Sequence, residues 1–175
     1  MRQRETEAEG PRAEVLGLDI GGVILDARTN DSDTSLFGPR YLEAKAVRGA
    51  FDGIRELVDR KFGERVHLVS KCGVPTQRRT RAWMDHHDFF DRTGILPENL
   101  HFCLTREGKA PICRRLRVSH FVDDRLEILG FLADAGVPNL YLFNAMEAEV
   151  ASHSERLSLV RVVNDWDALV KSLLA

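Results

Sequence analysis

Polar residues of chemically complementary types stand at four points along the chain. They are Asp19, Ser70, Lys109 and the adjacent pair Asp123 and Asp124. Each follows a short apolar run typical of a β-strand or opens a predicted helix. In an open α/β sheet the carboxyl ends of the strands form the edge where ligands bind. A sheet that aligned these ends would gather the five side chains in one site.

The combined chemistry of such a set would be phosphoryl transfer. Adjacent carboxylates and an exposed backbone carbonyl form a hard oxygen site that suits Mg²⁺. The Ser70 hydroxyl and nearby backbone N–H groups can donate hydrogen bonds to phosphoryl oxygens, while the Lys109 ammonium offsets negative charge. A carboxylate such as Asp19 can attack phosphorus and form an aspartyl-phosphate, which divides hydrolysis into two easier steps.

The first of these residues lies within the stretch 15–26, which reads VLGLDIGGVILD. Its apolar start predicts a buried strand that carries Asp19 at its tip. Gly21 and Gly22 then free the backbone to turn sharply. A strand that ends in an Asp before a glycine turn is also common without any function, so the rest of the chain must decide.

Strands and helices alternate along the rest of the chain. The order predicts right-handed crossovers and a doubly wound, three-layer α/β sandwich with a mostly parallel central sheet. We expect residues 13–175 to form this single domain, and residues 1–12, which are charged and almost without apolar side chains, to be a disordered tail. Further strands are expected at 66–70, 100–104, 119–122, 140–143 and 159–163, and the main helices at 47–62, 76–90, 126–135, 147–155 and 166–174.

Composition limits the classes of protein to consider. The chain has 175 residues, of which 43% are hydrophobic and 30% charged, as in globular proteins. Its formal net charge of −2 argues against attraction of the whole surface to nucleic acid or membrane. The net charge is still compatible with a local basic patch. No apolar run approaches the length of a membrane span, and the charged N-terminus is unlike a signal peptide, so we expect a cytoplasmic protein.

Cysteine and histidine spacing gives no sign of a zinc site. The three cysteines show no C-x-x-C pattern, which fits reduced, structural thiols better than a disulfide framework. The six histidines are not spaced from these cysteines as zinc ligands would be.

The basic start of the helix expected at 76–90 is more typical of a solvent-exposed helix face than of a phosphate contact. It contains Arg78, Arg79 and Arg81.

With these motifs in order, the chain resembles the haloacid dehalogenase-like (HAD) hydrolases, most of which are Mg²⁺-dependent phosphatases. LDIGGV matches the family's first motif at Asp19, HLVS the second at Ser70, Lys109 the third, and HFVDD the fourth at Asp123 and Asp124. Each motif is weak by itself, but four in the right order are specific together. The resemblance covers nearly the whole chain.

The resemblance implies a metal site and its ligands. Asp19 would be both the nucleophile and a Mg²⁺ ligand, the backbone carbonyl of Gly21 a second ligand, and Asp124 a third. Asp123 would support the metal and its waters.

The resemblance also implies a phosphate site. Ser70 would bind the phosphoryl group through its hydroxyl, and Lys109 would steady both Asp19 and the phosphate. The backbone N–H groups of Ile20 and Gly21 would complete the cradle around the phosphate.

One position departs from the family pattern. Phosphatases of this family usually carry a second Asp two residues after the nucleophile, as acid and base for the leaving group and water, but this chain has Gly21 there. Such help is worth roughly 10²- to 10⁴-fold in rate. Asp26 and Asp123 are candidate replacements for this acid.

The dehalogenase and phosphonatase branches of the family also lack that Asp, so C–Cl and C–P cleavage are minor alternatives. Some family members with glycine at this position resemble active sugar-phosphate phosphatases.

Two functions from different classes follow. The first is a Mg²⁺-dependent phosphatase that is slow because of Gly21, and the alternative is a catalytically weak or inactive relative that binds phosphate or a protein partner.

Only about twenty residues separate Asp26 from the next helix, so we expect a small cap or none and an open site. The segment VDDRLEILG is similar to the family's 5′-nucleotidase branch, which suggests a nucleotide, but a sugar phosphate or a phosphorylated macromolecule would also fit. The sequence does not determine the oligomeric state.

Overall fold

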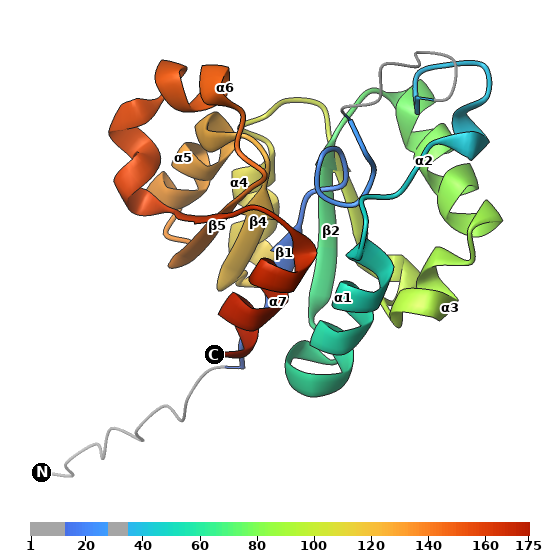
Figure 1. Cartoon of the computed structure of the whole chain (residues 1–175), viewed down its shortest axis with the longest axis horizontal. Helices are drawn as coiled ribbons and strands as arrows, with labels where there is room; N and C mark the ends of the chain where they lie inside the picture. Colours follow the sequence, from blue (N-terminus) through green and yellow to red (C-terminus); the bar gives the residue numbers. More distant parts are fainter. Residues whose placement is uncertain (1–12, 28–34) are drawn as a thin grey trace, which may run out of the picture.

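A six-stranded parallel sheet forms the centre of the protein, as seen in the computed structural model, which describes residues 13–27 and 35–175 (Figure 1). The strand order is β3-β2-β1-β4-β5-β6, and all five neighbouring pairs are parallel. The strands are β1 (Leu16–Leu18), β2 (Val66–Lys71), β3 (Leu100–Cys103), β4 (His120–Asp123), β5 (Asn139–Phe143) and β6 (Arg161–Val163). The predicted doubly wound α/β fold is therefore confirmed. The tail expected at 1–12 lies outside the described residues, and the single domain at 13–175 stays a prediction.

Helices cover both faces of the sheet (Figure 1). One apolar core lies between the sheet and α1, α2, α3 and α7, and a second lies between the opposite face and α4 and α5. The three layers follow from the alternation of strands and helices, because each crossover must return to the sheet across one face. The helices are α1 (Ala50–Leu57), α2 (Val74–His86), α3 (Phe89–Thr93), α4 (Lys109–Leu116), α5 (Leu126–Asp134), α6 (Glu147–Ser152) and α7 (Trp166–Leu174).

The chain changes direction across the sheet next to β1. After β1 it adds β2 and then β3 on one side, and it crosses to the other side for β4, β5 and β6. The carboxyl ends of β1 and β4 therefore border the switch point, which is where open α/β sheets bind ligands. In the register, Leu18 pairs with both Leu68 and Val122, so the residues that follow them reach the same edge.

Three helices differ from the prediction, and the one expected at 147–155 does so only at its end, since it stops at Ser152. The helix expected at 76–90 is divided into α2 and α3, because Asp88 takes a left-handed conformation with φ of 52°. The helix expected at 47–62 begins at Ala50 and ends in a π-helical segment, η2 (Val58–Phe62). The expected cap of the last helix is confirmed at Asp165, whose carboxylate accepts a hydrogen bond from the Ala168 N–H.

The described connections after β1 and β2 are short. Between β1 and α1 they contain two isolated bridges and one 3₁₀ turn, η1 (Tyr41–Glu43), and between β2 and β3 they contain α2, α3 and a second 3₁₀ turn, η3 (Pro97–Asn99). No large cap is found in these described segments. A last 3₁₀ helix, η4 (Ser154–Leu159), precedes β6. None of the helices in the described ranges combines the length and the hydropathy that a membrane span needs.

Candidate active site

Asp19 directly follows β1, and a tight turn fixes it in place. Its N–H donates to the carbonyl of Val122 on β4 at 2.9 Å. The carbonyl of Ile20 then accepts the N–H groups of two later residues in the turn, each at 2.9 Å. From α7, the indole N–H of Trp166 donates to the carbonyl of Val23 at 2.8 Å. Because the turn is held at both its start and its centre, the Asp19 carboxylate stays at the switch point.

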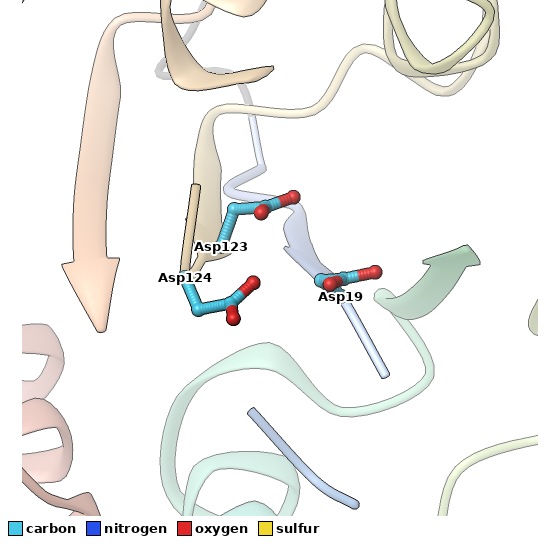
Figure 2. A group of neighbouring side chains, drawn as sticks. All are labelled: Asp19, Asp123 and Asp124. Carbon is cyan, nitrogen blue, oxygen red and sulfur yellow. The ribbon is translucent and has the colours of Figure 1, made fainter. Parts of the chain in front are cut away.

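Three carboxylates meet at this edge. Asp123 is the last residue of β4 and Asp124 follows it, so both lie next to Asp19 at the end of the neighbouring strand (Figure 2). One carboxylate oxygen from each residue lies within 4.8 Å of the other two. The structure therefore places the three acids side by side, and their function as a shared site stays a prediction.

Lys109 is the cation within this cluster. It is the first residue of α4 and is 1% exposed. Its Nζ donates to Asp19 Oδ1 at 2.8 Å and to Asp123 Oδ2 at 2.7 Å. Burial by itself would lower the pKa of Lys109, but the charges of Asp123 and Asp19 outweigh it and raise the pKa, so the side chain stays an ammonium.

Both carboxylate oxygens of Asp123 accept hydrogen bonds from within the protein. It is 0% exposed, its Oδ2 accepts from Lys109, and its Oδ1 accepts the N–H of Arg125 at 3.0 Å. Burial raises the pKa of the Asp123 carboxyl, and Lys109 acts in the opposite direction. These contacts hold the Lys109 ammonium beside Asp19.

The donor set fits a divalent cation. Three carboxylates face one ammonium, so two negative charges remain for a cation to balance. Burial, with the charge of Asp19 added, raises the pKa of Asp124 to about 6, because these two effects outweigh the opposing charges of Arg125 and Lys109. Hard oxygen ligands of this kind are those preferred by Mg²⁺.

A pocket of about 240 Å³ opens over this cluster. Asp19, Gly21, Ser70, Lys109 and Asp124 line it, whereas the other two predicted site residues, Ile20 and Asp123, do not. Ser70 lies near the end of β2, next to β1 in the sheet, and is nearly buried. Of the described residues, none offers a backbone carbonyl to the N–H of Ile20 or of Gly21, so both groups remain available to an anion.

Sequence reasoning missed the basic residues around this pocket. Lys71, Arg106 and Arg125 also line it. Each lies close in sequence to a motif residue: Lys71 follows Ser70, Arg125 follows Asp124, and Arg106 precedes Lys109 by three positions. This closeness to the motifs could have predicted that they line the pocket. Arg106 pairs with Glu127, and Arg125 lies 3.7 Å from Glu149, whereas Lys71 forms no ion pair within the described ranges. The pocket therefore combines an acidic floor with a basic rim.

The arginines of α2 serve the fold instead. Arg79 donates to the carbonyl of Phe37 at 2.7 Å and lies over the ring of Tyr41, and Arg81 lies over the ring of Phe102. Neither lines the pocket over the acidic cluster. The three cysteines are free thiols, and burial raises the pKa of each.

Comparison with solved structures shows the same fold at low sequence identity. A D,D-heptose 1,7-bisphosphate phosphatase from Burkholderia thailandensis matches with a TM-score of 0.58 and 17% identity, over 93% of this chain and 99% of that one. A HAD family hydrolase from Deinococcus radiodurans, solved with bound phosphate and sodium, matches with a TM-score of 0.63 and 11% identity, over 92% and 95% of the two chains.

The chain has the HAD-like hydrolase fold. No protein-family model matches it, and no curated protein matches it in sequence. The fold resemblance expected from the four motifs is thus confirmed by structure, at identities where sequence comparison finds nothing. In this HAD-like fold the acidic cluster lies at the switch point beside β1.

Proposed function

We propose that the protein is a Mg²⁺-dependent phosphatase that hydrolyses a phosphate monoester through an aspartyl-phosphate on Asp19. The observation that carries the proposal is the buried ammonium of Lys109, which bridges Asp19 and Asp123 beside Asp124 at the switch point of the sheet. A purely structural salt bridge would not need a third, partly buried carboxylate next to it, because a charge removed from water without a partner is costly.

Asp19, Asp124 and the backbone carbonyl of Gly21 would hold the metal ion, and Asp123 would support it. The ion, when bound, supplies positive charge that offsets the phosphate and the carboxylates. Gly22 leaves room for Asp124, since a Cβ at Gly22 would lie 2.3 Å from Asp124 Oδ2.

The remaining residues hold the nucleophile and the phosphate. Lys109 fixes Asp19 through Oδ1 and leaves the other carboxylate oxygen available for attack on phosphorus. The Ser70 hydroxyl and the N–H groups of Ile20 and Gly21 would donate to phosphoryl oxygens. A small phosphorylated compound, such as a sugar phosphate or a nucleotide, is the proposed substrate class, and one structural neighbour is a phosphatase of a heptose bisphosphate.

One observation favours the second candidate, an inactive protein that binds phosphate or a partner. A Cβ on Gly21 would meet nothing within 4 Å, so the space that a second acid would fill is open. Turnover decides between the two functions, because both would bind phosphate.

The test is hydrolysis of p-nitrophenyl phosphate and a panel of sugar phosphates and nucleotides by the full chain with Mg²⁺. We expect turnover by the wild-type protein and a loss of about 10³-fold or more in Asp19→Asn, which removes the nucleophile. Asp85→Asn, an exposed acid on α2, is the matched control and should behave as wild type. If the wild-type protein shows no turnover above Asp19→Asn on any substrate, the phosphatase proposal fails and the binding function remains.

A further inference from the structure

A second cavity, of about 170 Å³, adjoins the pocket that opens over the acidic cluster, which is called the first cavity below. Among the described residues, five line both cavities: Gly21, Ala27, Phe37, Ser70 and Lys71. Gly21 and Ser70 belong to the proposed phosphate site. A phosphoryl group bound there would therefore have the second cavity next to it.

Most of the surface of the second cavity is apolar, although polar residues also line it. Ile20, Leu25 and Ala44 belong to the lining and are otherwise buried in the core, with exposed fractions of 1%, 4% and 4%. The hydroxyl of Thr80, another lining residue, donates to the carbonyl of Thr76 at 2.8 Å. A chemical group that enters this cavity would therefore exchange water mainly for apolar contacts.

The wall formed by the segment 36–44 is fixed to α2. The guanidinium of Arg79 donates to the carbonyl of Phe37 at 2.7 Å, and the indole N–H of Trp83 donates to the carbonyl of Ala44 at 2.8 Å. Arg79 and Trp83 are four positions apart, so they lie on the same face of the helix. The second cavity is thus formed before any ligand binds, as is usual for small-molecule sites.

Gly21 lies at the boundary between the two cavities, since it lines both. Its φ is outside the left-handed region, so the backbone at this position does not require a glycine. A Cβ at Gly21 would meet nothing within 4 Å, so a side chain there would extend into open space. The lack of a side chain therefore leaves the boundary between the cavities open.

We propose that Gly21 opens the first cavity into the second, and that the organic part of the substrate, a compact apolar group, occupies the second cavity. The proposal rests on the proposed phosphatase function and narrows its substrate class to phosphate monoesters of compact apolar alcohols. Sites for drug-sized ligands measure about 300–1,000 Å³, so this cavity is too small for a nucleoside. A sugar would bury hydroxyl groups against a mainly apolar surface, which is costly without hydrogen-bond partners.

Two phosphate esters of primary alcohols test the substrate class, because their leaving groups have similar reactivity. Benzyl phosphate carries an apolar ring, and glycerol 3-phosphate carries a polar chain. We expect kcat/KM of the wild-type protein with Mg²⁺ to be higher for benzyl phosphate by about tenfold or more, since the cavity removes its ring from water. Equal values, or a preference for glycerol 3-phosphate, would overturn the proposal.

Gly21→Leu tests the opening between the cavities. The new side chain would obstruct the second cavity, so the ratio of kcat/KM for benzyl phosphate to that for glycerol 3-phosphate should fall about tenfold. The ratio is the readout, because a change at Gly21 also affects the proposed metal and phosphate contacts of its backbone, which both substrates share. An unchanged ratio would overturn the role of Gly21.

Gly73→Leu is the matched control for this variant. Gly73 lines neither cavity, and a Cβ there would meet only Pro75 Cδ, at 3.9 Å. We therefore expect the substrate ratio of the wild-type protein. The same fall in Gly73→Leu as in Gly21→Leu would contradict the proposal, because it would not depend on the cavity.

Leu36→Ser changes the lining of the second cavity without touching a proposed metal or phosphate residue. We expect the ratio to fall about threefold or more, because the ring would lose apolar contact. Leu42→Ser changes a half-buried leucine of the neighbouring η1 that does not line this cavity, so it should keep the wild-type ratio. Equal ratios in the two variants would show that the cavity does not hold the organic group.

Ligand binding separates this proposal from the phosphatase function. In benzylphosphonate the benzyl carbon is bonded directly to phosphorus, and methylphosphonate lacks the ring. Calorimetry with the full chain and Mg²⁺ should give a Kd about tenfold or more lower for benzylphosphonate, and Gly21→Leu should remove most of the difference. Equal affinities in the wild-type protein would overturn the cavity assignment. Tighter binding of benzylphosphonate by a protein that hydrolyses neither ester would support the cavity assignment and refute the phosphatase function.

Discussion

Gly22 and Asp124 approach each other so closely that no side chain fits between them. A Cβ on Gly22 would lie 2.3 Å from Asp124 Oδ2, and Gly22 has φ of +77°, a conformation that other residues adopt at a cost. The glycine is therefore a condition for the position of the Asp124 carboxylate rather than only a flexible point in the turn.

Gly22→Ala should disturb both stability and the site. The left-handed backbone costs roughly 1–2 kcal/mol for alanine, and the methyl group must also displace Asp124. We expect a loss of about 2 kcal/mol in urea unfolding and weaker Mg²⁺ binding. Gly21→Ala is the matched control for stability, because its Cβ has open space and its φ is not in the left-handed region. Equal losses of stability in both variants would contradict this explanation.

Lys109→Met should destabilise the protein in metal-free buffer. The ammonium is the partner of two buried carboxylates, and removing one member of a buried ion pair costs about 3–5 kcal/mol. Lys71→Met, at the exposed end of β2, should change the free energy of unfolding by less than about 0.5 kcal/mol. Chemical unfolding of both variants measures the difference. A Lys109→Met protein as stable as Lys71→Met would show that the buried carboxylates do not need the lysine.

Mg²⁺ should raise the Tm of the wild-type protein, independently of any activity. Binding to the folded state alone adds about 2.7 kcal/mol at 100 times the Kd, and EDTA should reverse the shift. Asp124→Asn removes a proposed ligand whose pKa burial and the charge of Asp19 raise to about 6, so the variant should lose most of the shift. Thermal unfolding across a Mg²⁺ titration tests this. An undiminished shift in Asp124→Asn would place the metal elsewhere.

The pair formed by His67 and His101 should make stability depend on pH. Their ring nitrogens lie 3.2 Å apart on β2 and β3, and burial, together with His101, lowers the pKa of His67 to about 4. An unfolded histidine has a pKa of about 6.5, so between these values the unfolded chain binds more protons, and stability falls as the pH falls.

The effect should be about 1 kcal/mol between pH 7 and pH 5, after a discount for partial exposure of the ring. Urea unfolding at both pH values measures it. His67→Gln has no titrating group at that position and should show a smaller loss. A variant with the wild-type pH dependence would assign the effect to other histidines, such as His120, whose pKa burial also lowers.

The positions of the candidate site residues were predictable because of how parallel sheets are built. Asp19, Ser70 and Asp123 each end an apolar run, and in a parallel sheet such ends lie on one edge whatever the loops do. The acidic pair and the lysine were identified by their place in that order. Helix boundaries were less predictable, since the break at Asp88 depends on a backbone conformation that the apolar pattern does not reveal.

The contacts that give the residues their roles were not predictable. Lys109 and Asp19 are 90 positions apart, and only the packing of α4 against the sheet brings the ammonium to both carboxylates.

The amino-acid sequence by itself determined the order of elements and the residue types at the strand ends, since periodicity and turn residues are local properties. The tertiary structure decided which acids pair with Lys109 and which acid lies beside that pair. Those outcomes depend on distances between segments far apart in the chain, and burial then changes the charge balance of each group. Gly21 illustrates the division: the sequence shows a glycine there, and only the fold shows that a side chain at that position would meet open space.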